Sequence, residues 1–120
     1  MNADRCIDEA ALDRLRRLDR DGTLVKDMID VFLDYTPRLV AAALAGEKAG
    51  DLDAIERAAH SLKSSAANLG ARVVQDLALR IELLARDKDM GAIVPLLREL
   101  VAAFERAKAR LENLRKELSQ

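Results

Sequence analysis

With 120 residues, the chain is long enough for a single domain with a core (residues 1–120). Half of its residues are hydrophobic but only 2% are aromatic, and this Ala- and Leu-rich, charged composition predicts an all-α fold. The 20 Lys and Arg residues nearly balance 21 Asp and Glu residues, so no basic field exists to hold nucleic acid or an anionic membrane, and neither is an expected partner. Cys6 is the only cysteine, which excludes an internal disulfide, and without a signal peptide or a membrane-length apolar run the simplest location is the cytoplasm.

The first two predicted helices cover about residues 8–18 and 23–45. Leucines recur at helical spacing in the first, with Asp8 as a candidate N-cap, and this short helix is expected to pack at one end of a bundle. Pro37 interrupts the second pattern, because proline removes a backbone donor and clashes with the preceding turn. Two alternatives follow: one helix kinked near Pro37, or two helices with Thr36 capping the second.

The third predicted helix covers residues 51–69 and carries the only histidine of the chain. Asp51 is its candidate N-cap and Gly70 its candidate stop. At about 100° per residue, His60 projects from the polar face, away from the core. The residues expected to face the core are Ile55, Ala58, Ala59, Leu62, Ser65, Ala66 and Leu69.

Two further helices are predicted at about residues 72–88 and 92–118. The tight connection at Gly70 makes the third and fourth helices antiparallel neighbours. If the turn centres on position 71, His60 faces Glu82 and Glu56 faces Arg86. The heptad-like seam of the last helix spans only about three heptads, which favours packing within one chain over a coiled-coil dimer. We therefore predict a monomeric, antiparallel up-down four-helix bundle with a short extra N-terminal helix and a second helix kinked or broken near Pro37.

The surface around His60 has the character of a docking face. Lys63 lies one turn further along the same strip, where its ammonium could reach an anion held on the imidazole ring. The side chains at i+4 and i+7 are short, which leaves room for another protein to approach the ring. The residues expected to contact a partner are Arg57, Ser61, Ser64, Ala67, Asn68 and Arg86.

Neutral imidazole is a good nucleophile near neutral pH and can accept a phosphoryl group. For one ring nitrogen to attack, the other must carry the proton, and a carboxylate beside the ring can hold that arrangement. Glu82 is the candidate for this role, the alternative being that it only forms an i,i+4 surface pair with Arg86. Lys63 would act on the phosphoryl oxygens, and Arg86 either adds a second positive charge or pairs with Glu56.

These residues resemble a known family. The segment Ala59-His60-Ser61-Leu62-Lys63-Ser64, followed by Asn68-Leu69-Gly70-Ala71, is similar to the A-H-x-L-K-G and L-G-A pattern of the histidine-containing phosphotransfer (HPt) domain. Further landmarks are Ile7-Asp8, Phe32-Leu33 ahead of Thr36-Pro37, and Gly50-Asp51, so the resemblance covers most of the chain. One position departs from the pattern, because Ser64 stands where the family usually has glycine.

The resemblance implies a phosphorelay carrier that accepts a phosphoryl group on His60 from a receiver-domain aspartate and passes it to another receiver. Its implied partners are response-regulator receiver domains, a hybrid histidine kinase, or both, with Mg²⁺ supplied by the receiver. The chain has no Gly-rich phosphate-binding loop, so we expect no autonomous kinase activity and no cofactor. One His and one distant Cys do not form an ordinary metal site. The alternative function is a helical adaptor that binds a partner through the same face without phosphorylation.

Overall fold

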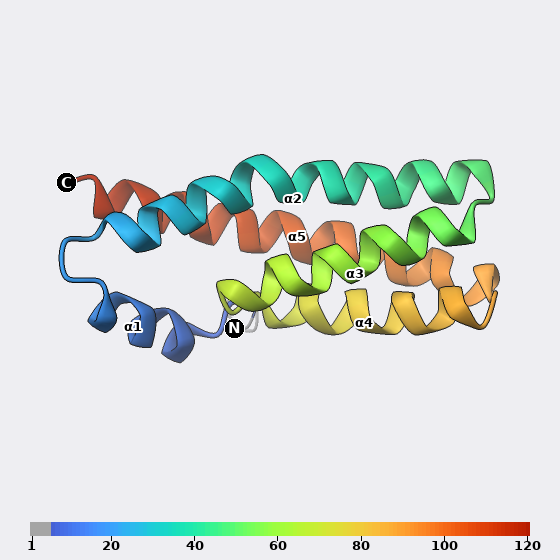
Figure 1. The fold of residues 1–120 in the computed structure, drawn as a ribbon, viewed down its shortest axis with the longest axis horizontal. Coiled ribbons are helices and arrows are strands. Elements are labelled where there is room, and N and C mark those ends of the chain that lie inside the picture. The colour runs from blue at the N-terminus through green and yellow to red at the C-terminus, as the bar shows by residue number, and fades with distance from the viewer. Residues whose placement is uncertain (1–5) are drawn as a thin grey trace.

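The computed structural model describes residues 6–120, which form five α-helices and no strand. The helices are α1 (Glu9–Leu18), α2 (Thr23–Ala49), α3 (Leu52–Asn68), α4 (Arg72–Arg86) and α5 (Met90–Leu118). The four longer helices run alternately up and down, and each packs on the next, with α5 returning to α2 (Figure 1). The predicted four-helix bundle with an extra N-terminal helix is confirmed. Within the described residues, no helix combines the length and the apolar character needed to cross a membrane.

The helix α2 runs unbroken through Pro37, so the alternative of two helices capped by Thr36 is wrong. Figure 1 shows α2 changing direction along its length, as a proline within a helix causes. Thr36 is fully buried and shares a 2.7 Å hydrogen bond with the hydroxyl of Ser65 on α3. The threonine therefore connects two helices instead of starting one.

The end of α2 lies beyond the predicted boundary at residue 45, because Gly46 is part of the helix and not its stop. A Cβ at Gly46 would come within 2.9 Å of the Ile55 side chain and 3.2 Å of the Asp51 carbonyl oxygen. Glycine at this position therefore allows α2 and α3 to approach closely near their connection. The chain reverses at Gly50, whose φ of 68° lies in the left-handed region that favours glycine.

The helix α3 starts and stops where the sequence predicts. The Asp51 carboxylate accepts a 3.0 Å hydrogen bond from the backbone N–H of Ala54, and Gly70 adopts a φ of 71° just beyond the helix. The carbonyl oxygen of Gly70 accepts a 2.7 Å hydrogen bond from the backbone N–H of Asp8, which itself caps α1. The α3–α4 turn is thus tied to α1 at one end of the bundle.

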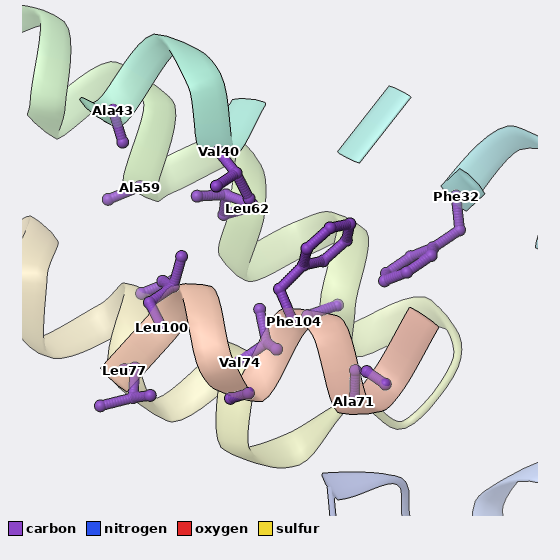
Figure 2. Packing of buried hydrophobic residues seen from close by; sticks show 14 of the residues in the cluster. Phe32, Val40, Ala43, Ala59, Leu62, Ala71, Val74, Leu77, Leu100 and Phe104 are labelled. Atoms are coloured by element: carbon purple, nitrogen blue, oxygen red, sulfur yellow. The ribbon is translucent and has the colours of Figure 1, made fainter. Parts of the chain in front are cut away.

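The core fills the space between the four long helices. Phe32 of α2 and Phe104 of α5 pack with ring centroids 6.0 Å apart. Val40 of α2, Leu62 of α3 and Leu100 of α5 belong to the same buried cluster (Figure 2). Burial in α3 follows the predicted core face at every position except Ser65, which is half-buried. This agreement fixes the orientation of α3 and therefore directs His60 outward.

Replacing Leu62 with alanine tests this packing. Leu62 is fully buried, so Leu62→Ala should lower the free energy of unfolding by about 2–5 kcal/mol through lost contacts and the cavity left behind. Urea denaturation measures the change. Ser64→Ala on the exposed face of the same helix is the control and should stay within about 0.5 kcal/mol of the parent. A neutral Leu62→Ala variant would contradict the packing of α3.

Candidate functional site

The side chain of Glu82 on α4 is the centre of the site. It is only 1% exposed, and its two oxygens bind three groups at 2.8 Å: Oε2 accepts from His60 Nδ1 and from the Arg86 guanidinium, and Oε1 accepts from Lys63 Nζ. Arg86 Nε also donates a 2.7 Å hydrogen bond to Glu56. The predicted register of the α3–α4 hairpin, with His60 opposite Glu82 and Glu56 opposite Arg86, is confirmed.

The surroundings of Glu82 determine its charge. Burial by itself would raise the pKa of its carboxyl, but hydrogen bonds from Lys63 and His60, together with the positive charges of Lys63 and Arg86, bring the pKa below its ordinary value of 4.5. Glu82 is therefore ionised at neutral pH. The alternative that Glu82 forms only an i,i+4 surface pair is wrong, since the pair with Arg86 is one of three contacts made by a buried carboxylate.

An ionised carboxylate can only accept hydrogen bonds, which defines the protonation of the imidazole ring. Because Glu82 Oε2 accepts from Nδ1, this nitrogen of His60 carries the proton. The other nitrogen, Nε2, then has its lone pair available in the neutral ring. The His60 side chain is 62% exposed, so the site presents a nucleophile to a visiting protein.

Lys63 lies on the same side of α3 as His60, but it is not freely solvated. Its side chain is 30% exposed and its ammonium is held by Glu82. An ammonium has three N–H donors, so Lys63 can keep this contact and still donate to an anion on the ring. Of the two roles considered for Arg86, the pairing with Glu56 is present, and its guanidinium also pairs with Glu82.

The structure gathers the predicted partner-docking residues around His60. Five are exposed: Arg57, Ser64, Ala67, Asn68 and Arg86. Ser61 is half-buried and lines two shallow depressions beside the imidazole, one toward α4 with Glu82 and Arg86 and one toward α2. Ser61 therefore borders the imidazole on both sides, and docking through these residues stays a prediction.

Sequence reasoning missed the contribution of α2 to this surface. Val31 and Tyr35 continue the apolar pattern of α2, yet they are 63% and 46% exposed and line the depression that reaches His60. The positions of Val31 and Tyr35 along α2, relative to its buried residues, could have shown that they face outward. The buried positions Ile29, Phe32 and Thr36 define the inner face of α2, and Val31 and Tyr35, one turn apart, lie to one side of it.

Comparison with known proteins assigns the family. The sequence profile of the Hpt domain matches residues 27–119. The chain belongs to the Hpt domain family. The fold is similar to the crystal structure of histidine-containing phosphotransfer protein B (HptB) from Pseudomonas aeruginosa PAO1, with a TM-score of 0.85 and 21% identity over 93% of this chain and 96% of that chain. No curated protein matches the sequence. As an Hpt domain, the chain is a histidine phosphotransfer carrier in phosphorelay signalling.

Among residues 6–120, no cluster of three or more His, Cys, Asp or Glu side chains has a metal-binding arrangement. The acidic side chains at the site already have partners, since both oxygens of Glu82 accept hydrogen bonds and Glu56 binds Arg86.

The pKa shift of Glu82 gives this Hpt domain a pH-dependent contribution to stability. A carboxyl whose pKa is lower in the folded than in the unfolded state stabilises fully above the unfolded value, and that stabilisation is lost as the pH falls through the folded value. Glu82→Gln should therefore be less stable than the parent at neutral pH, and the difference should narrow below pH 4.5. Urea denaturation across this range measures it, with Glu112→Gln on the exposed side of α5 as control. If the difference in free energy of unfolding between Glu82→Gln and the parent did not change with pH, Glu82 would not be an ionised, buried carboxylate.

Proposed function

We propose that His60 is the residue that carries the phosphoryl group and that Nε2 is the atom to which it is attached. The observation that supports this most directly is the 2.8 Å contact between His60 Nδ1 and the buried Glu82 carboxylate. That contact places the ring proton on Nδ1 and leaves the lone pair of Nε2 on an exposed side chain. His60 is also the only histidine of the chain.

The transfer follows from this arrangement. The Nε2 lone pair attacks the phosphorus of an aspartyl phosphate, the P–O bond to the aspartate breaks, and the donor's carboxylate leaves. The imidazole becomes positively charged, and Glu82 stabilises this charge through the proton on Nδ1. Lys63 offers its remaining N–H groups to the phosphoryl oxygens. Passing the group to the next aspartate reverses these steps, with Mg²⁺ supplied by the receiver.

The partners proposed for this chain are receiver domains docking on the His60 face. Hpt domains partner with receiver domains and histidine kinases in phosphorelays. Here a receiver would meet small and polar side chains of α3 beside the apolar pair Val31 and Tyr35 of α2. We further propose that the chain acts as a monomer. An adaptor without phosphorylation would use the same face, but it has no need of a buried carboxylate that orients the imidazole.

Phosphorylation of His60 is tested with a phosphorylated receiver. The wild-type protein should acquire acid-labile, base-stable phosphate, and His60→Gln should acquire none while keeping its helical circular dichroism. Receiver binding should persist in the variant, because the glutamine retains most of the docking surface. Absence of label on the wild type with several receivers would overturn the proposal, whereas label that persists in His60→Gln would place the phosphate elsewhere.

The role of Lys63 is tested separately from that of His60. Lys63→Ala should slow phosphotransfer by at least about tenfold, because a charged donor to the phosphoryl group is lost. It should also lower the free energy of unfolding by about 1–3 kcal/mol, because Glu82 loses one of its partners. Single-turnover transfer and urea denaturation measure the two effects, with the exposed Lys116→Ala as control. An unchanged transfer rate would remove Lys63 from the site.

A further inference from the structure

The hydrogen bond between His60 and Glu82 gives the imidazole ring a direction. Glu82 lies on α4, so Nδ1 faces α4. Nε2 lies at the far end of the ring, on the other side from Nδ1. A phosphoryl group on Nε2 is therefore directed away from Glu82. The side chains that line the surface beside His60 on its α2 side are then its candidate neighbours.

A shallow depression of about 330 Å³ lies on that side, between α2 and α3. Its lining includes His60 and several side chains that can donate hydrogen bonds: Tyr35, Ser61, Ser64, Ser65 and Asn68. The hydroxyl of Ser65 is already bonded to Thr36 at 2.7 Å. The Tyr35 and Ser64 side chains are exposed and bind no side chain or backbone group within residues 6–120.

The two cations of the site, Lys63 and Arg86, do not lie on the α2 side of the imidazole. Lys63 and Arg86 both lie against carboxylates on the α4 side of the imidazole. A phosphoryl group has three outer oxygens that share its negative charge, and one ammonium approaching from the α4 side does not reach all of them. The side chains that line the depression toward α2 include hydroxyl groups and no Lys or Arg.

We propose that Tyr35 Oη and Ser64 Oγ donate hydrogen bonds to the phosphoryl group on His60 Nε2, completing the contacts that Lys63 makes from the other side. Ser64 stands one turn after His60 on α3, and Tyr35 of α2 lines the same depression as both. Glycine, the usual residue of the family pattern at the Ser64 position, has no hydroxyl, so this chain binds its phosphoryl group with a donor that the pattern lacks. This assignment rests on the proposed function and adds two catalytic residues to it.

The decisive experiment phosphorylates the isolated protein with phosphoramidate, which removes docking from the measurement. The P–N bond of phosphoramidate breaks as the bond to His60 Nε2 forms. The leaving nitrogen already carries three protons in the zwitterionic form of phosphoramidate, so it departs as ammonia. Tyr35→Phe and Ser64→Ala should each slow labelling and shorten the phosphohistidine half-life by about three- to tenfold, and the double variant by more. Phosphorus NMR should place the label on Nε2 of the wild type.

The controls separate this assignment from other roles. Tyr35→Phe keeps the aromatic ring, so a role limited to apolar docking would leave labelling of the isolated protein unchanged. Ser119→Ala at the end of α5 should have no effect, and all variants should keep the parent melting temperature because both hydroxyls are exposed.

The outcomes also distinguish the two proposals. A wild-type protein that is labelled on His60 at rates unaffected by Tyr35→Phe and Ser64→Ala would overturn the hydroxyl contacts and leave the carrier function intact. Label on Nδ1 would overturn both the hydroxyl contacts and the assignment of Nε2, because the phosphoryl group would then lie on the α4 side, but it would leave His60 as the carrier. A wild-type protein that takes up no label on His60, from phosphoramidate or from receivers, would overturn the proposed function itself.

Discussion

The burial of one negative charge controls the geometry of this site. Moving a carboxylate out of water is unfavourable unless hydrogen bonds and opposite charges compensate for the lost solvation. Glu82 has both, because the imidazole and two cations use both of its oxygens. Two of these three partners come from α3, so the interaction also fixes how α3 lies on α4. The position of the imidazole is thus a consequence of how the hairpin satisfies a buried charge.

This interaction divides the surface around His60 into two unlike sides. Toward α4 lie the charges, arranged as a chain from Lys63 through Glu82 and Arg86 to Glu56. Toward α2 lie hydroxyl groups and exposed apolar side chains, with Val31 and Tyr35 foremost. The charged side sets the proton on the ring through the buried Glu82, and its cations are paired within the chain. The other side is open, and a partner can cover it without having to desolvate ion pairs, which makes docking there less costly.

Much of this arrangement could be predicted from the sequence, because helical periodicity and a short turn are local features. The phase of α3 directed His60 outward, and counting residues from Gly70 placed Glu82 opposite it. Other features depend on how helices pack. Apolar residues cover more of α2 than its neighbours can bury, so the sequence alone did not show that Val31 is exposed. Nor did it show that α2 continues through Pro37, since packing along the whole helix compensates for one missing hydrogen bond.

The openness of the site is consistent with transfer in two directions. An enzyme that completes one reaction gains from closing over its substrate, because exclusion of water strengthens electrostatic contacts. A carrier must accept a group from one protein and surrender it to another, so strong contacts on every side of the phosphoryl group would trap it. Here the charges next to His60 are already partly neutralised by Glu82 and Glu56, and the hydroxyl side offers only neutral donors. Under the proposed function, such a site would hold the phosphoryl group loosely, and the metal of a docked receiver would supply the remaining stabilisation of the transition state.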